Sequence, residues 1–541
     1  MMRATMTGGA FLRMTVLWRT LGLMLALMLA APAAQAQVTA FRQAVAEAAA
    51  RDEDLAAFYR AREFEGLWTG SGGTDRARRA ALVAAFEGAG DHGLPAARYD
   101  AQALLARLAA AQTPAEQGAL DVEMSRLFLQ YARDVQTGIL VPGRVDSLIK
   151  REVPYRSRLG TIQGFAQSNP AAFLRSLPPS SPEYTRLMRE KLRLENLLAA
   201  GGWGPTVGGG ALAPGASGPA VVALRNRLIA MGYLARSASQ SYDAALQAAV
   251  QQFQLAHGLA ADGTAGEGTL REINVAPEQR MQSIIVAMER ERWLNRPRGA
   301  RHIWVNLTDF TAAIVDNDRV TFSTRSVIGA GDLDRQSPEF SDVMEFMVIN
   351  PSWYVPRSII TKEYLPQLRN NPNAVSHLQI TDSRGRVINR SGANFAQYTE
   401  ASFPFAMRQP PSADNALGLV KFMFPNQYNI YLHDTPAKNL FGREVRAFSH
   451  GCIRLNDPFD FAYELLSRQE SNPEAFFQAK LATGDETRVN LEEPVPVHLV
   501  YRTAFTNVTG ALQFRRDVYG RDARIWNALA REGVAVRAVQ G

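Results

Sequence analysis

The sequence predicts a multidomain α+β protein with a helical N-terminal part, a small helical bundle and a β-rich C-terminal domain. Three observations predict this class. The chain has 541 residues, 46% of them hydrophobic, so it can bury several separate cores. Helical periodicity dominates the first three hundred or so residues, whereas alternating strand patterns begin near His302. A glycine-rich stretch, residues 201–218, separates two helical regions and marks a boundary.

The first 36 residues have the pattern of a secretory signal. Arg13 and Arg19 precede the apolar run LGLMLALMLAA, and Ala34-Gln35-Ala36 fits the small-residue rule for cleavage. The run is too short to span a bilayer comfortably, and no other stretch approaches about 18 consecutive apolar residues. We therefore expect a periplasmic protein with no permanent membrane span after cleavage. An uncleaved anchor is the alternative.

The rest of the chain divides into four further segments. Residues 37–200, rich in Ala, Arg, Leu and Glu, predict a helical scaffold domain, and residues 201–218 predict a flexible linker. Residues 219–275 predict a compact bundle of three short helices, since apolar side chains recur there at spacings of three and four. Residues 276–299 predict a connecting helix that stops at Pro297. Residues 300–541 predict the β-rich domain, which begins with two strand-like runs around a turn at Asn317-Asp318.

The only cysteine, Cys452, is the strongest functional signal in the chain. It cannot form an internal disulfide, and in an exported protein a single cysteine is better explained by reactivity than by cross-linking. His450 precedes it by two residues and His433 by nineteen. Because a free thiol is mostly protonated near neutral pH, an adjacent imidazole that takes its proton creates an attacking thiolate. This composition indicates acyl transfer by a cysteine nucleophile.

The neighbours of the cysteine fit the same chemistry. Gly451 leaves space for a carbonyl to approach, and the N–H groups of Gly451 and Cys452 are candidate donors to an oxyanion. Arg454 adds a permanent cation. If the segment is extended, His450, Cys452 and Arg454 share one face, and a strand through YNIYLHDT delivers His433 at its end. Spacing does not choose between the two histidines as base.

Other interpretations of these residues remain open from the sequence. A cysteine chosen at random is more often a small buried hydrophobe. Zinc binding by His433, His450 and Cys452 is disfavoured, because the spacing matches no common zinc motif and there is no second cysteine, so no metal or other cofactor is predicted. Arg454 as a surface ion-pair partner is a third alternative.

His433 with its HDT sequence, together with SHGCIR and Asn456, resembles the signature of L,D-transpeptidases, which cross-link bacterial peptidoglycan. The resemblance implies that Cys452 attacks the diaminopimelate carbonyl of a tetrapeptide stem, that His433 is the general base and that the Asp434 backbone carbonyl orients it. It also implies that His450 is a second polar group of the pocket or an alternative base. Many members carry glycine where this chain has Asp434. Substrate contacts are expected from Arg454, Ser449, Trp353 and Tyr354, although the two aromatic residues are equally well explained as core.

Two further regions carry resemblances. Residues 219–275, with AVQQFQ, HGL and DG in order, resemble the peptidoglycan-binding domain of wall enzymes, and residues 37–200 loosely resemble the N-terminal region of large periplasmic L,D-transpeptidases. The family implies a β-sandwich-like catalytic domain at residues 300–541, with a capping insertion at about 358–413. Such a cap would exclude water from the acyl-enzyme.

The expected function is therefore transfer of the acyl group to an amine of another stem, which makes 3-3 cross-links and releases D-alanine. The expected partners are peptidoglycan tetrapeptide stems, with lipoprotein or other wall enzymes as additional partners. One alternative is a periplasmic cysteine hydrolase of peptidoglycan or lipoprotein linkages, and another is a non-catalytic wall-binding scaffold. The net charge of +7 suits an anionic wall and is too weak to indicate nucleic-acid binding.

Overall fold

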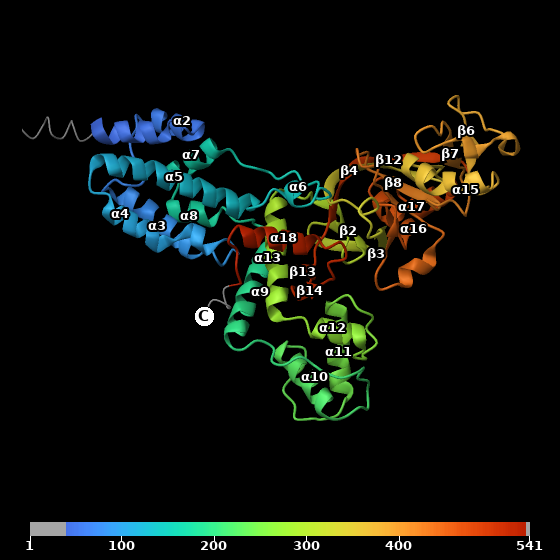
Figure 1. The fold of residues 1–541 in the computed structure, drawn as a ribbon, viewed down its shortest axis with the longest axis horizontal. Coiled ribbons are helices and arrows are strands. Elements are labelled where there is room, and N and C mark those ends of the chain that lie inside the picture. The colour runs from blue at the N-terminus through green and yellow to red at the C-terminus, as the bar shows by residue number, and fades with distance from the viewer. Residues whose placement is uncertain (1–38, 537–541) are drawn as a thin grey trace, which may run out of the picture. The chain divides into compact units, whose positions relative to one another are not determined.

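The computed structural model describes residues 39–536, so the predicted signal at residues 1–36 lies outside the described residues (Figure 1). The chain forms two compact units. The first unit comprises the chain up to Ile139 together with Pro154–Ser181 and Ala530–Ala535. The second comprises Leu140–Val153 and Pro182–Leu529. No helix among the described residues has the length and apolarity that crossing a membrane requires.

The first unit is helical, as predicted. Its longest helix, α5, starts with a capping box. The side chains of Thr113 and Glu116 each accept a hydrogen bond from the backbone N–H of the other residue. Asp121 of α5 is buried and accepts hydrogen bonds from the Tyr59 hydroxyl and the Trp68 N–H. Trp68 is fully buried and belongs to the core of this unit. The helices are α2 (Glu53–Ala61), α3 (Gly73–Glu87), η1 (Ala96–Tyr99), α4 (Ala101–Ala110), α5 (Pro114–Thr137), α7 (Arg158–Gln167) and α8 (Pro170–Arg175).

The three-helix bundle is confirmed as α10 (Pro219–Ala230), α11 (Ala244–Ala256) and α12 (Glu267–Ile273). Its core contains the apolar residues that recur along α10 and α11. The predicted flexible linker behaves differently, because it packs against this bundle. Val207 is buried in the bundle core, and the Asn274 side chain exchanges two hydrogen bonds with the Val207 backbone. A few apolar side chains and the Asn274 amide therefore anchor this segment to the bundle. Its glycine-rich composition had suggested that it would not pack.

The connecting helix α13 (Pro277–Trp293) is buried around almost its whole circumference in its last two turns. The sequence pattern does not predict this, because these turns carry charged residues. Arg290 pairs with Glu339 and with Asp522, and Arg502 pairs with Glu291. Desolvation of these charges is offset only because each has a partner of opposite sign. The second unit also contains the helices α6 (Pro142–Val145) and α9 (Pro182–Ala199).

A nine-stranded mixed sheet forms the centre of the second unit. The hairpin turn predicted at Asn317-Asp318 is confirmed, with φ of 49° and 62°, the left-handed conformation that both residue types tolerate. In sheet order the strands are β10 (Ala447–Ser449), β3 (Arg319–Gly329), β11 (Ile453–Leu455), β9 (Leu432–His433), β8 (Val420–Met423), β4 (Phe340–Ile349), β12 (Thr487–Val500), β1 (Arg301–Asn306) and β2 (Thr311–Asp316).

The predicted β-sandwich is corrected by the pairing of β2 with β3. The last strand in the sheet order, β2, pairs with the second, β3, so the sheet closes on itself in a barrel-like manner instead of forming two stacked layers. The long strand β3 allows this, because it pairs with β2 along its first half and with β11 and β10 at its end. Closure removes free sheet edges around one hydrophobic core. Phe461 of α16 (Pro458–Leu466) and Phe477 of α17 (Pro473–Leu481) complete that core.

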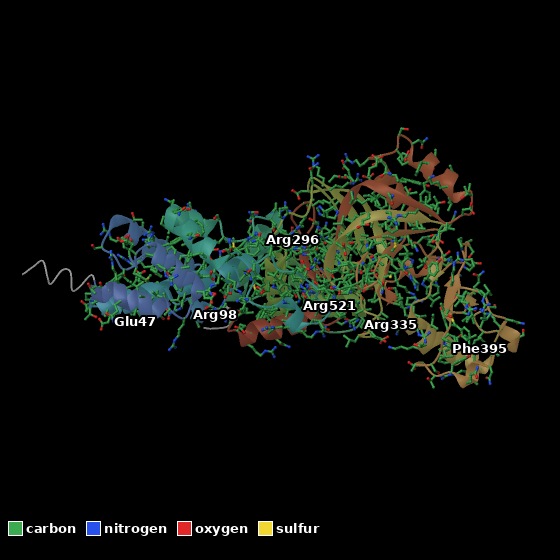
Figure 2. The ribbon with its side chains drawn as sticks, turned by 90° about the horizontal axis from the view of Figure 1, so that it is seen from above. Glu47, Arg98, Arg296, Arg335, Phe395 and Arg521 are labelled. Atoms are coloured by element: carbon green, nitrogen blue, oxygen red, sulfur yellow. The ribbon has the colours of Figure 1, made fainter. Side chains whose placement is uncertain are left out.

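The insertion between β4 and β8 has a hydrophobic core of its own, which runs from Trp353 to Leu417 and includes Phe395 (Figure 2). It is therefore wider than the predicted residues 358–413. A small sheet holds it together, in the order β5 (Trp353–Tyr354), β7 (Ala406–Gln409) and β6 (Gln379–Thr381). The helical elements are α14 (Arg357–Ile359), the π-helix η2 (Ile360–Tyr364), α15 (Leu365–Asn370), η3 (Arg390–Gly392) and η4 (Phe395–Gln397). The chain ends in β13 (Ala504–Thr506), β14 (Leu512–Phe514) and α18 (Arg521–Arg531).

We expect the fold to lose stability as the pH falls from 6.5 to 5. Burial lowers the pKa of four histidines, to about 3 for two of them, so they stay neutral while the fold is intact: His257, His302, His433 and His498. In the unfolded chain these histidines become protonated below the ordinary histidine pKa of about 6.5. Each such histidine therefore costs up to about 1.4 kcal/mol of unfolding free energy per pH unit in that window. Urea unfolding at pH 6.5 and 5.0 measures the loss.

Substituting one of these histidines tests the cause. The His257 imidazole stacks on the Phe253 ring, with 3.8 Å between the ring centroids. The substitution His257→Phe keeps an aromatic ring at this position and removes one titrating group. The pH dependence of unfolding should then decrease by about one proton. His377→Gln is the matched control, because His377 is exposed, and it should leave the slope unchanged. Equal slopes in the two variants would contradict the prediction.

Candidate active site

The end of β9 and the turn between β10 and β11 bring the predicted residues together. Strand β9 places His433 opposite Arg454 of β11, and the two strands are parallel. Cys452 immediately precedes β11, and the Ile453 N–H donates to the Tyr431 carbonyl at 3.1 Å. The cysteine, the first histidine and the arginine are therefore adjacent across one strand pair. The sequence predicted this neighbourhood from the strand through YNIYLHDT.

Cys452 is half-buried, packs against the barrel core and lies at the start of β11. Its thiol donates to the Asn429 carbonyl at 3.5 Å. Burial raises the pKa of the thiol to about 11, while hydrogen bonds with Tyr431 and the charge of Arg454 lower it. The resting cysteine is therefore a thiol near neutral pH, and a base must remove its proton before it can attack.

His433 is buried and points one ring nitrogen at the backbone. Its Nδ1 lies 2.5 Å from the Asp434 carbonyl oxygen, so Nδ1 carries the proton and Nε2 is left as the acceptor. Burial lowers the pKa of His433 to about 3, and the charge of Arg454 acts in the same direction. The imidazole is neutral at every pH near neutrality, which is the protonation state of a base ready to accept a proton.

No hydrogen bond joins the thiol to either imidazole within residues 39–536. The high pKa of Cys452 and the low pKa of His433 agree with a neutral resting pair instead of a thiolate and an imidazolium. The thiol has to turn away from the Asn429 carbonyl before an imidazole can accept its proton. Such tightening on substrate binding is common at catalytic sites.

The Asp434 side chain anchors the strand end that carries the base. Its carboxylate accepts from the Leu419 N–H at 2.9 Å and from the Lys438 ammonium at 2.8 Å. Gly418, with φ of 62°, lies so close that a Cβ there would fall 2.2 Å from the carboxylate. The aspartate that follows His433 thus has a structural explanation, since its carbonyl orients the ring while its carboxylate fixes the adjoining loop.

The SHGC segment is a closed turn and not an extended strand, which corrects the predicted common face of His450, Cys452 and Arg454. Gly451 has φ of 113°, a conformation that requires glycine. The Ser449 hydroxyl donates to the Cys452 carbonyl at 2.5 Å and accepts from the Gly451 N–H at 3.1 Å. Ser449 is buried, and both bonds stay within the turn. Among the described residues no acceptor occupies the Cys452 N–H.

Ser337 fixes the turn from outside. Its hydroxyl donates to the Gly451 carbonyl at 2.6 Å, and the Gly329 N–H donates to the same hydroxyl at 2.9 Å. Arg521 in turn donates to the Ser337 carbonyl at 2.8 Å (Figure 2 labels Arg521). The loop before β4 therefore holds the peptide that precedes the cysteine in place.

His450 is exposed and turns towards the insertion. Its Nε2 lies 2.6 Å from a carboxylate oxygen of Glu363, on the π-helix η2. The preceding residue, Lys362, forms an ion pair of 2.8 Å with Asp334, in the loop between β3 and β4. Two consecutive residues of the insertion therefore contact the two loops that flank Cys452. We call these two contacts the latch.

Arg454 has an incompletely satisfied guanidinium. Its Nε is buried without a hydrogen-bond partner in the part of the chain that the structure describes. Burial lowers the pKa of Arg454, and the neighbouring Cys452 opposes that shift. The group remains charged at neutral pH, so an unpaired cation lies beside the thiol. A carboxylate or an oxyanion of a bound substrate would satisfy it.

Tyr431 is a site residue that the sequence reasoning missed. Burial raises its pKa well above the ordinary value, and the charge of the neighbouring Cys452 adds to the shift. It packs against both the barrel core and the core of the insertion. A signal was present in the sequence, because Tyr431 stands two residues before His433 and side chains at that spacing share a strand face.

Trp353 and Tyr354 lie in the insertion. Trp353 is buried in its core and contacts the Tyr364 ring at 6.4 Å between centroids. Tyr354 is exposed, with the Arg408 guanidinium 5.6 Å above its ring. The structure brings neither residue into contact with Cys452 within the described region. No group of three or more His, Cys, Asp or Glu side chains that could hold a metal occurs in residues 39–536.

Comparison with family profiles assigns three parts of the chain. Residues 300–488 match the L,D-transpeptidase catalytic domain, residues 217–273 match a peptidoglycan binding domain, and residues 53–190 match a scaffold domain. The catalytic match spans His433, Cys452 and Arg454.

One curated relative and one solved structure are similar to parts of the chain. A Haemophilus influenzae protein named "Putative L,D-transpeptidase" is 29% identical over 242 residues, which are 44% of this chain and 48% of the relative. The chain thus spans about half the length of that relative. The crystal structure of an L,D-transpeptidase from Xylanimonas cellulosilytica is 16% identical, with a TM-score of 0.16, and covers 55% of this chain and 100% of its own.

Proposed function

We propose that this chain, whose residues 300–488 match the L,D-transpeptidase catalytic domain, transfers acyl groups between peptide stems of peptidoglycan, with Cys452 as the nucleophile. The observation that carries the proposal is the pairing of the chain's single thiol with a neutral imidazole. His433 is buried with its Nδ1 proton directed at the Asp434 carbonyl, one strand away from Cys452. A neutral imidazole in this position can act as the base for nucleophilic catalysis by cysteine once the thiol turns towards it.

The proposed reaction has two halves. In the first, His433 accepts the Cys452 proton while the sulfur attacks the diaminopimelate carbonyl of a tetrapeptide stem. The bond to the terminal D-alanine then breaks, its nitrogen leaves with the proton from His433, and a thioester remains. In the second half, an amine of another stem gives a proton to His433 and attacks the thioester, which forms an amide and returns the thiol. The product is a direct link between two diaminopimelate residues.

The surrounding groups have proposed roles in these steps. The Cys452 N–H and the Tyr431 hydroxyl are donors for the oxyanion or the thiolate, and Arg454 supplies the charge for a substrate carboxylate. The Gly451 N–H contributes to the oxyanion only if it leaves the Ser449 hydroxyl, to which it donates. We therefore assign Ser449 to shaping the turn.

We propose that the insertion is a cap that disfavours water as acceptor. The latch supports this role, because His450–Glu363 and Lys362–Asp334 hold the insertion against the two loops beside the thiol. Trp353 then stabilises the cap from within its core, and Tyr354 is a surface residue of the cap. The competing function, a cysteine hydrolase, uses the same acyl-enzyme and differs only in the acceptor.

Weakening the latch should shift the products towards hydrolysis. We expect Glu363→Gln combined with Asp334→Asn to raise the ratio of hydrolysed to cross-linked stems by about two- to fivefold, because exposed ion pairs contribute at most about 1 kcal/mol each. Mass spectrometry of the products measures the ratio. Asp414→Asn is the matched control, since Asp414 is an exposed acid of the same insertion outside the latch. An unchanged ratio would count against a gating role.

The proposed function is tested with purified protein and tetrapeptide-stem fragments. Dimers that have lost one alanine indicate transpeptidation, shortened monomers indicate hydrolysis, and unchanged fragments indicate a wall-binding scaffold. The matches to a transpeptidase catalytic domain and to a peptidoglycan binding domain support a location outside the cytoplasm. We propose export to the periplasm through residues 1–36, with peptidoglycan stems as the main partner and lipoprotein as an additional acceptor.

A further inference from the structure

A cavity of about 380 Å³ lies apart from the active-site turn, between the peptidoglycan-binding bundle and the barrel. On one side is the loop 255–260 that follows α11. On the other are the turn 308–311 between β1 and β2, the segment 441–446 before β10 and residues 515–518 after β14. A volume of this size accommodates a small ligand or part of a peptide. The proposed catalytic steps do not use this cavity.

The cavity has an excess of positive charge. Five arginines and two acids line it. Arg515 forms an ion pair with Asp309, and Arg516 forms one of 2.8 Å with Glu444. These pairs neutralise both acids of the lining. The remaining three arginines have no carboxylate partner among the described residues: Arg325, Arg443 and Arg446.

None of the three arginines is paired with a carboxylate in the described structure. Arg446 is fixed by backbone carbonyls, to which all three of its guanidinium nitrogens donate, at 3.1 Å (Ser326), 2.9 Å (Arg443) and 3.1 Å (Phe310). Arg325 uses a single nitrogen on the Phe441 carbonyl. Arg443 is exposed and its side chain has no partner within residues 39–536. Burial lowers the pKa of Arg446, the charge of Arg325 adds to the shift, and the Asp309 carboxylate opposes it.

Apolar surface lies between these charges. Phe310 is covered by the Arg446 guanidinium at 5.1 Å from its ring centroid, and Leu255 is 62% exposed at the rim. Guanidinium groups recognise carboxylates through paired hydrogen bonds, and the apolar wall suits methyl and methylene groups. The fitting ligand is therefore an acidic peptide with small apolar side chains.

We infer that this cavity binds a second peptide stem of peptidoglycan through its carboxylates, while the Cys452 site holds the donor stem. The inference rests on the proposed function. Two observations favour a stem as the occupant. The loop 255–260 belongs to the segment that matches a peptidoglycan binding domain. In addition, Arg446 precedes β10 and Cys452 follows it, so six residues connect cavity and thiol, and they span at most about 20 Å.

Binding of the full-length protein to purified sacculi tests the inference. The double substitution Arg325→Gln and Arg443→Gln should raise the apparent Kd by about tenfold, the loss expected for charge-assisted contacts to carboxylates. The matched control is Arg319→Gln with Arg384→Gln, which removes two exposed arginines outside the cavity and should leave the Kd unchanged. Release of D-alanine from a soluble tetrapeptide donor should stay within about twofold of the wild type in the control variant.

Two further binding measurements test the same inference. Sacculi whose carboxylates have been amidated should bind the wild-type protein as weakly as the double variant. Arg443→Gln alone should also weaken binding, and it cannot act through misfolding because this side chain is exposed and unpartnered in the described structure. Wild-type affinity of both arginine variants, or equal binding to amidated sacculi, overturns the inference. Absence of D-alanine release by the wild type would instead overturn the proposed function, and the binding comparison would still decide on the cavity.

Discussion

Replacing Cys452 with alanine is expected to reduce the release of D-alanine and the formation of dimers by about 10⁴-fold or more. The single cysteine supplies the covalent intermediate, and the other groups of the site act only on that intermediate. Mass spectrometry of tetrapeptide-stem fragments after incubation measures both products. The expected loss is the largest that any single substitution in this chain should cause.

The Cys452→Ala protein should still bind sacculi with wild-type affinity. The side chain is small and half-buried, and its hydrogen bond to the Asn429 carbonyl is weak, so its removal should change the free energy of unfolding by about 1 kcal/mol or less. The bundle at residues 217–273 and the arginines of the cavity are untouched. Turnover that survives the substitution would assign the chemistry to another residue, and a wild type without turnover would favour the wall-binding scaffold.

The second largest effect is expected at His433. His433→Ala should lower kcat/KM by about 10²- to 10⁴-fold, the usual contribution of a general base. The pKa of His433 lies at about 3 because of burial and Arg454, so the base is already neutral above that value. We therefore expect the kcat/KM of the wild type to show no loss from protonation of this histidine between pH 5 and 8. A rate profile across that range checks the expectation.

Two further variants separate the contributions around the base. Arg454→Met removes a charge that lowers the pKa of His433, so the acidic limb of the profile should move to higher pH. His450→Ala should cost much less than His433→Ala, because His450 is exposed and bonded to Glu363 of the cap. A greater loss at His450 than at His433 would reverse the assignment of the base.

The sequence predicted those parts of the fold that depend on local pattern. Helical spacing located α10, α11 and α12, and the pair Asn317-Asp318 located a hairpin turn with both residues left-handed. Closure of the sheet was not predictable in this way. It depends on which strands pair, and the alternation along β2 and β3 is the same in a sandwich and in a barrel.

In the candidate active site, too, the residues of a local motif were predicted and the contacts from distant parts of the chain were not. Cys452, His433 and the Asp434 carbonyl came from a motif whose members lie close in the chain, and strand pairing joins them. Glu363 was missed because it reaches His450 from 87 residues away. The inward turn of Ser449 also escaped prediction, because it follows from the left-handed backbone at Gly451 and not from the identity of the serine.

The buried ion pairs of α13 decide where the catalytic part of this protein can be cut. Its Arg290 meets Glu339 and Asp522, and its Glu291 meets Arg502. A fragment beginning at residue 300 would keep those three partners and lose the charges that neutralise them. Shortened forms made for crystallography or inhibitor screening should therefore start before Pro277, so that they contain both the helix and the barrel.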